Sequence, residues 1–297
     1  MLYQLKTPLI ETHIAPLQEI PIRLQEYGVG IFTTIATKSA LKKAIKKKLL
    51  FVDGKIATTA MFIKGNEVIT YNPEIAINLS TPLKGKRKLL LNLEVVYEDD
   101  YLAIINKPAG ILTSGNAFKT VANGLQQNLK KSELGDAVHP QPVHRLDYPT
   151  TGLLLVGKTT ASILALNKLF ENKEISKTYL AVTIGDMQEN GSIDIKVDGK
   201  DALSFYKVLA TVPSKRFGFL NLAQLSPETG RRHQLRKHLT AIGNPVLGDA
   251  VYGMEGLVLK GKGMYLHAFS LEFTHPFTKE KMRVEKECPE KFRKLFG

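Results

Sequence analysis

Cysteine is nearly absent from this chain of 297 residues, which contains only Cys288. An internal disulfide and a zinc site built on cysteines are therefore excluded. A zinc-dependent deaminase is excluded as well, because the sequence has no Cys-x-x-Cys pair. Such low cysteine usage fits a reducing compartment.

Long apolar runs are also missing. No stretch approaches the length of a membrane span, and residues 1–6 lack the basic start and apolar core of a signal peptide. We therefore expect a cytoplasmic protein with no membrane partner. The hydrophobic fraction of 43% and the charged fraction of 23% are typical of a soluble globular chain, here long enough for two domains.

Acidic residues are few relative to basic ones. The chain has 41 Lys and Arg against 28 Asp and Glu, a formal net charge of +13. An excess of this size favours a polyanionic partner, with nucleic acid as the first candidate and a membrane surface as the second. The alternative is a basic protein without such a partner.

The positive charge is most concentrated near the start of the chain. Residues 41, 45 and 49 are apolar and recur every four positions, which predicts a helix beginning near Ser39. Its other side offers phosphates a positive face, although a lysine-rich helical face is often only solvated. The lysines of that side are Lys42, Lys43, Lys46 and Lys47.

Short strands follow this helix. Residues 51–56 read as a hairpin around the turn Asp53-Gly54, and residues 67–71 as another strand. The order of these features resembles the S4 RNA-binding domain over about residues 20–71. The features are the helix, then Val-Asp-Gly-Lys, then Ile-Lys-Gly-Asn-Glu-Val. We expect an S4-like domain over residues 1–80, a basic linker over 81–92 and a larger domain over 93–297.

The larger domain contains an informative segment at residues 144–152, His-Arg-Leu-Asp-Tyr-Pro-Thr-Thr-Gly. The apolar run that follows, residues 153–156, is typical of a buried strand. Asp147 is then expected in the loop at the mouth of this strand, a common position for a catalytic group. The alternative is that Asp147 only caps the turn.

Two further segments carry candidate residues. Residues 177–184 alternate as a strand that places Tyr179 on the more polar face, where it can meet a ligand. Residues 230–239 look like the start of a helix that ends near Gly243, with Arg232 and Arg236 stacked four residues apart. A guanidinium can keep a carboxylate ionised in an apolar pocket, and we predict that Arg236 pairs with Asp147.

The motifs His-Arg-Leu-Asp-x-x-Thr-Thr-Gly, Lys-x-Tyr-Leu-Ala and Gly-Arg-Arg-His-Gln-Leu-Arg-x-His resemble those of the RluA-type RNA pseudouridine synthases. Residues 243–249, 266–268 and 273–276 fit this family too, so the resemblance runs from about Leu93 to the end. It implies an α+β catalytic domain with a central, mostly antiparallel sheet, preceded here by the small α+β S4-like domain.

The resemblance also implies a chemistry, in which uracil is detached from C1′ of the ribose, turned, and rejoined through C5. The target base has to be flipped out first, and Arg145 is implied as the side chain that takes its place. Asp147 is implied as the catalytic carboxylate; whether it attacks C1′, adds to C6 or removes the 2′ proton stays open. By the same resemblance Tyr179 is implied to take or relay the C5 proton, and Arg236 to keep Asp147 charged and oriented.

The remaining expectations concern partners. No cofactor and no metal are needed, the protein is expected to be a monomer, and ribosomal RNA of the large subunit is favoured over transfer RNA. Further RNA contacts are expected from the four lysines near residue 45 and from His144, Thr151, Lys177, Arg232 and His233.

Two alternatives belong to other functional classes. A metal-dependent nuclease could use His139 with His144, or His233 with His238, and Asp147 and Asp249 could join them. A spacing of five suits one helical face poorly, however, and no His-Glu-x-x-His is present. The other alternative is an inactive RNA-binding or ribosome-assembly factor. The joint presence of an acid, a phenol and a guanidinium in the family motifs argues against it.

Overall fold

The computed structural model describes residues 10–32, 35, 38–73, 89–259 and 261–297. The chain divides into two compact units, a front unit within residues 1–87 and a second unit within residues 88–297. The second is called the catalytic unit because it contains the catalytic domain that the sequence predicts. Most of the predicted linker, residues 81–88, lies outside the described residues. No described helix is both long enough and apolar enough to cross a membrane.

The front unit is a small α+β structure. Its four-stranded sheet has the order β1 (Glu11–Ile14), β6 (Val68–Tyr71), β3 (Leu50–Val52), β4 (Lys55–Ile56). The other elements are the pair β2 (Ile22–Arg23) and β5 (Phe62–Ile63) and the helices α1 (Leu24–Tyr27) and α2 (Lys38–Lys46).

The predicted helix and the predicted Asp-Gly hairpin of the front unit are confirmed. Leu41 and Ile45 of α2 are buried in the core of this unit, whereas the four lysines of the predicted basic face are exposed. The β3–β4 turn uses positive φ values at Asp53 (49°) and Gly54 (74°), as an Asp-Gly hairpin turn requires. The Asp53 side chain also accepts the backbone N–H of Val68, which ties this turn to β6.

The catalytic unit is built on one 10-stranded sheet. Its strand order is β12 (Asn190–Asp194), β13 (Leu203–Ser214), β14 (Gly218–Pro227), β11 (Ser176–Ile184), β15 (Leu266–Thr274), β10 (Thr151–Thr159), β8 (Leu102–Lys107) and β7 (Glu94–Glu98). In addition β16 (Lys281–Glu285) pairs with β15, and β9 (Ala137–Pro142) with β10. The predicted mostly antiparallel sheet is confirmed: the described pairs are antiparallel except β10–β15.

Gly152 makes the parallel contact between β10 and β15 possible. It has a φ of 108°, and a Cβ atom there would lie 2.3 Å from the carbonyl oxygen of Ala268 on β15. Only glycine fits both the conformation and the close approach. The glycine of the 144–152 segment thus sets how β10 begins, immediately after the loop that carries Asp147.

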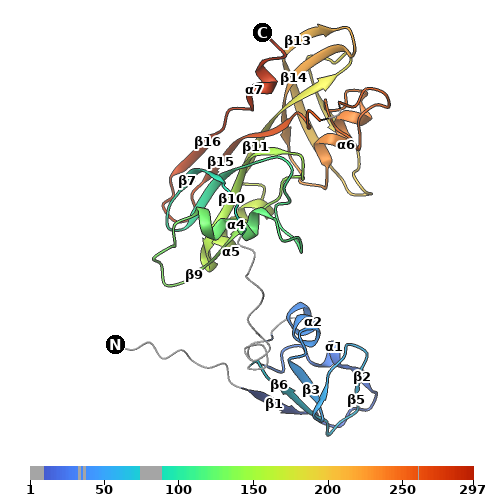
Figure 1. Cartoon of the computed structure of the whole chain (residues 1–297), viewed down its shortest axis with the longest axis vertical. Coiled ribbons are helices and arrows are strands. Elements are labelled where there is room, and N and C mark those ends of the chain that lie inside the picture. The colour runs from blue at the N-terminus through green and yellow to red at the C-terminus, as the bar shows by residue number, and fades with distance from the viewer. Residues whose placement is uncertain (1–9, 33–34, 36–37, 74–88, 260) are drawn as a thin grey trace. The chain divides into compact units, whose positions relative to one another are not determined.

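Helices cover both faces of this sheet (Figure 1). On one face α4 (Val121–Asn128) packs over β8 and β10, and α6 (Gln234–Ala241) packs over β11 and β14. Tyr179 packs against both clusters, so it lies where they meet. The helices α5 (Thr160–Glu171) and α7 (Glu290–Arg293) contribute Leu166 and Phe292 to the clusters built on the alternate residues of the same strands.

Two local expectations are wrong. The sequence predicted a more polar face along the whole of β11, but after Tyr179 that face is buried. Ala181 and Thr183 are fully buried, and α6 packs over this side of the strand. Arg232 and Arg236 do not stack along one helix either, because α6 begins only at Gln234 and His233 before it is left-handed, with φ 56°. The expected contacts of Leu235, Leu239 and Ile242 with the core are confirmed.

Candidate active site

A cavity of about 720 Å³ opens where the α4 and α6 halves of the sheet meet. Three parts of the chain supply most of its lining: the loop 143–147 before β10, the start of β11 with Lys177 and Tyr179, and residues 226–236 from the end of β14 into α6. The segments that the sequence singled out separately therefore meet in one place. Its size is within the usual range for ligand sites.

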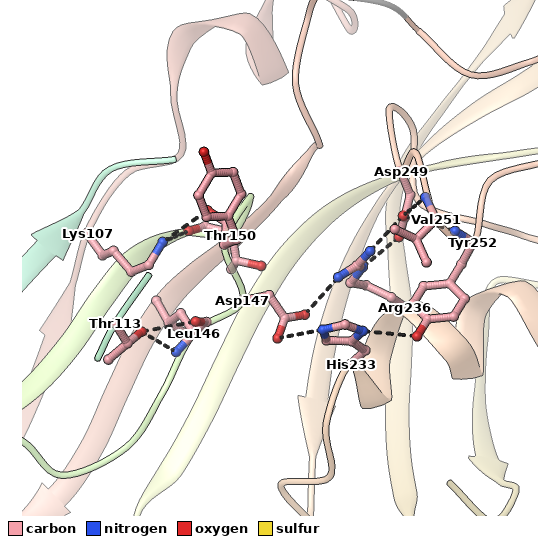
Figure 2. A network of polar contacts seen from close by, with 11 residues as sticks. Lys107, Thr113, Leu146, Asp147, Thr150, His233, Arg236, Asp249, Val251 and Tyr252 are labelled. Carbon is pink, nitrogen blue, oxygen red and sulfur yellow. Dashed lines mark hydrogen bonds and ion pairs between the residues drawn. The ribbon is translucent and has the colours of Figure 1, made fainter. Parts of the chain in front are cut away.

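Asp147 and Arg236 form an ion pair in this cavity (Figure 2). The Arg236 Nη1 donates to Asp147 Oδ2 at 3.2 Å, which confirms the predicted pair. The Arg236 side chain is only 3% exposed and that of Asp147 15% exposed, so water screens their interaction weakly.

A second carboxylate, Asp249, fixes the guanidinium of Arg236. Arg236 Nε donates to Asp249 Oδ2 at 2.7 Å and Nη2 donates to Oδ1 at 2.8 Å, a bidentate arrangement. Burial alone would lower the pKa of Arg236, but the hydrogen bonds and charges of Asp249 and Asp147 raise it above its usual value. Arg236 is therefore a fixed cation that holds Asp249 through Nε and Nη2 and donates to Asp147 through Nη1.

The loop that carries Asp147 is held by Lys107 at the end of β8 and by Thr113 in the segment after it (Figure 2). Lys107 is fully buried, and its Nζ donates to the carbonyl oxygens of Pro108, Tyr148 and Thr150. Thr113 Oγ1 accepts the N–H of Leu146 and donates to its carbonyl oxygen. Burial lowers the pKa of Lys107 to about 8, against the opposing charge of Asp147.

Tyr179 of β11 lines the same cavity. Burial, and then the charge of Asp147, raise the pKa of its phenol above the usual value. At neutral pH this phenol is therefore protonated, and it can accept a proton only while passing its own to another group.

Comparisons with known proteins agree with this geometry. Residues 101–241 match the RNA pseudouridylate synthase family. The chain is 31% identical to the ribosomal large subunit pseudouridine synthase C of Rickettsia conorii, over 91% of this chain and 95% of that protein. It is also 31% identical to the tRNA pseudouridine synthase C of Vibrio vulnificus, over 69% of this chain and 94% of that protein.

The chain belongs to the RNA pseudouridylate synthase family. It is an isomerase, and its partner is RNA. The human RNA pseudouridylate synthase domain containing 1 has the same fold, with a TM-score of 0.56 and 24% identity over 69% of this chain and 86% of that one.

Several other residues predicted as RNA contacts also line the cavity of this synthase. They are His144, Arg145, Lys177, Arg232 and His233. Arg145 and Arg232 are exposed, whereas His144 is held in place because its Nε2 accepts the N–H of Leu155. The pKa of Lys177 is lowered by burial, against the charge of Glu228.

The structure does not bring Thr151 to the cavity. Its hydroxyl is hydrogen-bonded to His267 Nδ1 at 2.7 Å, and Thr151 is not among the lining residues. The four lysines of the α2 segment belong to the front unit, whereas the residues that line the cavity belong to the catalytic unit.

The histidines of the nuclease alternative have other partners. His139 contacts the carbonyl oxygen of Pro140, and His238 contacts the Ser204 hydroxyl and the Ile195 carbonyl oxygen. In the described part of the chain no three His, Cys, Asp or Glu side chains are grouped as metal ligands. Asp249, which that alternative also used, instead binds Arg236.

Sequence reasoning gave no catalytic role to four residues around Asp147: Lys107, Thr113, Asp249 and Tyr252. Lys107 lies at the end of a regular strand pattern, and nothing local marks the distant carbonyl groups that it binds. The signal that could have found Asp249 is chemical, because an arginine buried beside one carboxylate still needs acceptors for its other N–H groups.

Proposed function

We propose that this protein converts uridine to pseudouridine in large-subunit ribosomal RNA, with Asp147 as the reacting carboxylate. The observation that carries the proposal is the ion pair of Asp147 with a buried arginine inside a cavity large enough for a nucleotide. Arg236 balances the charge of Asp147 and orients its carboxylate through Oδ2, while Oδ1 of Asp147 lies nearest to His233.

The base has to leave the RNA stack before Asp147 can reach it. Arg145 is exposed on the same loop, two residues before Asp147, and has a long cationic side chain. We propose that the Arg145 side chain enters the RNA stack and fills the space that the flipped uridine leaves. The other exposed cation of the cavity, Arg232, and the half-buried Lys177 are assigned to neighbouring phosphates.

In the reaction the bond between C1′ and N1 breaks and a bond between C1′ and C5 forms. The proton on C5 is released and N1 gains one, so the reaction needs no external oxidant or reductant. Asp147 can start it by attack at C1′, by addition to C6 or by removal of the 2′ proton. Tyr179 relays the C5 proton as a neutral phenol, because its raised pKa keeps it protonated beforehand.

The extent of the matches supports ribosomal RNA as the target. The large-subunit enzyme of Rickettsia conorii matches 91% of this chain, which has to include most of the front unit. The transfer RNA enzyme of Vibrio vulnificus matches 69%, about the length of the catalytic unit alone. The front unit is thus shared with the relative named for the large subunit.

The front unit is proposed as an S4-like RNA-binding domain. Four exposed lysines on and after α2, together with the hairpin β3–β4, support this assignment. Deletion of residues 1–80 should weaken RNA binding and flatten its salt dependence, since fewer phosphates are neutralised. An unchanged salt slope in a folded deletion variant, checked by circular dichroism, would contradict the assignment.

Pseudouridine mapping tests the proposed target directly. Total RNA from cells with and without this protein is mapped at single-nucleotide resolution. We expect a large-subunit site that vanishes in the deletion and returns with the intact gene but not with Asp147→Ala. A site that changes only in transfer RNA would overturn the target, and no changed site would favour an inactive RNA-binding factor.

We further propose that the protein acts as a monomer in the cytoplasm. The acid, the guanidinium and the phenol of the site all come from one chain, so the cavity does not need a second copy. Light scattering at working concentration tests the monomer, and a dimeric mass would contradict it.

A further inference from the structure

The two carboxylate oxygens of Asp147 face different side chains (Figure 2). Oδ2 accepts a hydrogen bond from Arg236, whose guanidinium is fixed by Asp249. Oδ1 faces the His233 Nε2 at 3.7 Å. A side chain that faces a reacting oxygen needs a defined orientation. Asp249 gives Arg236 its orientation, whereas the orientation of the His233 imidazole must come from another residue.

The backbone of His233 is held in an uncommon conformation. Its φ of 56° and ψ of 24° are left-handed, and its side chain makes no capping hydrogen bond to α6. Residues other than glycine are uncommon in this region, although histidine enters it more readily than most, and such conformations often occur at functional sites. The imidazole accordingly points to the cavity, where its two nitrogen atoms face different groups.

The second nitrogen of His233, Nδ1, lies 3.0 Å from the hydroxyl of Tyr252. The two rings meet edge to face, at 5.7 Å and 72°. Burial lowers the pKa of His233; Asp147 opposes this, whereas Arg236, Arg232 and Lys237 add to it. The imidazole is therefore neutral at neutral pH, with one nitrogen carrying a proton and the other accepting one.

Tyr252 is itself well fixed. Its backbone N–H donates to Asp249 Oδ1 at 3.1 Å, and its carbonyl oxygen accepts from the Thr240 hydroxyl at 2.9 Å. The Arg236 guanidinium lies over the Tyr252 ring, 4.9 Å from its centre. The short segment 249–252 thus contacts both side chains that face Asp147.

We infer that Tyr252 is a positioning residue: its hydroxyl donates to Nδ1 of His233 and so keeps the proton of the imidazole on Nε2, facing Asp147. A carboxylate only accepts hydrogen bonds, so this is the one neutral tautomer that suits both neighbours of the ring. The inference rests on the proposed role of Asp147 and adds to it that Oδ1 has a dedicated donor.

Tyr252→Phe tests the inference because it removes only the hydroxyl and keeps the ring under Arg236. We expect kcat on large-subunit RNA to fall about five- to tenfold, as for one lost hydrogen bond, with KM and melting temperature unchanged. Tyr101→Phe is the matched control, since the Tyr101 ring stacks on Phe277 and neither residue lines the cavity. An unchanged kcat in Tyr252→Phe would overturn the inference.

A double-mutant cycle separates a role through His233 from a general structural role. Glutamine at position 233 offers an amide N–H near the place of Nε2 without needing a tautomer. Tyr252→Phe should therefore cost several-fold in the parent and almost nothing in the His233→Gln background. An equal loss in both backgrounds would show that Tyr252 does not act through His233.

Nitrogen-15 NMR of the side-chain imidazole gives a readout that does not depend on activity. In the parent the His233 Nε2 should be protonated and Nδ1 bare, and Tyr252→Phe should give a mixture of both tautomers. The same tautomer in both proteins would contradict the inference. If Asp147→Asn retains full activity, the proposed function fails; if only Tyr252→Phe does, the positioning role alone fails.

Discussion

The two units of this protein use positive charge in opposite ways. In the front unit, the lysines on and after α2 are exposed, and their charges face solvent. In the catalytic unit, Arg236 and Lys107 are almost completely buried, and each is hydrogen-bonded to fixed acceptors. Exposed charges act in sum and are screened by salt, whereas buried ones depend on one geometry. Binding and chemistry should therefore respond differently to substitution.

The largest effect is expected for Asp147→Asn. Turnover should fall at least about a thousandfold, because the amide cannot act as nucleophile or base. The fold should persist, since Arg236 keeps both hydrogen bonds to Asp249. Single-turnover kinetics and RNA titration check this together, with an affinity within about threefold of the parent expected for a purely chemical residue. A parallel loss of binding would contradict the assignment of Asp147.

Arg236→Lys should come next, with kcat lowered about a hundredfold. An ammonium keeps the charge but cannot bind Asp249 through two N–H groups and still donate to Asp147. The measurement is single-turnover rate beside melting temperature, because the buried Asp249 also loses a hydrogen bond. Full activity in Arg236→Lys would show that charge alone, without the fixed geometry, is sufficient.

Lys107→Met should act on stability first. Three carbonyl groups around the Asp147 loop lose their donor, and we expect a loss of about 3 kcal/mol in the free energy of unfolding. Denaturant unfolding measures it. A change below about 0.5 kcal/mol would mean that the loop is held without Lys107.

The same variant makes a prediction on pH. The pKa of Lys107 is about 8 in the folded protein against a usual 10.5, so the unfolded chain binds more protons between these values. This group therefore makes the unfolding free energy of the parent rise with pH across that window, and Lys107→Met removes the rise. The difference between parent and variant should grow by up to about 3 kcal/mol from pH 8 to 10.5. A constant difference would argue against a lowered pKa.

The smallest effects are expected from single Lys→Gln changes in the front unit. Each should weaken RNA binding about two- to threefold and reduce the slope of log affinity against log salt by about 0.7 to 0.9. Lys42, Lys43, Lys46 and Lys47 are tested singly and together, with the exposed Lys281 of the catalytic unit as matched control. An equal effect of Lys281→Gln would mean that RNA binding depends on the total charge of the protein and not on the lysines of the front unit.

Much of this arrangement could be predicted from local patterns. The apolar run after Gly152 predicted the buried strand β10, and the chemical need of a carboxylate for a cation predicted the pair of Asp147 with Arg236. The first prediction rests on hydrophobicity over a few consecutive residues, and the second on one strong ion pair. Both are confirmed.

The rest depends on contacts that no local pattern records. Lys107 binds carbonyl groups 41 and 43 residues away, so its role is invisible until the loop and the strand lie together. The left-handed His233 shifts the start of α6, and helical spacing alone therefore misplaced Arg232. Burial of both faces of β11 follows from the packing of α6, which the alternating strand pattern does not reveal.

The most direct test of the contrast between the units is a single-turnover titration on one large-subunit RNA, with the enzyme raised to saturation. The account predicts that the variant with all four front lysines changed to glutamine reaches the parent rate at high concentration. Asp147→Asn should form no product at any concentration. A quadruple variant that stays slow at saturation, or an Asp147→Asn variant that turns over, would contradict it.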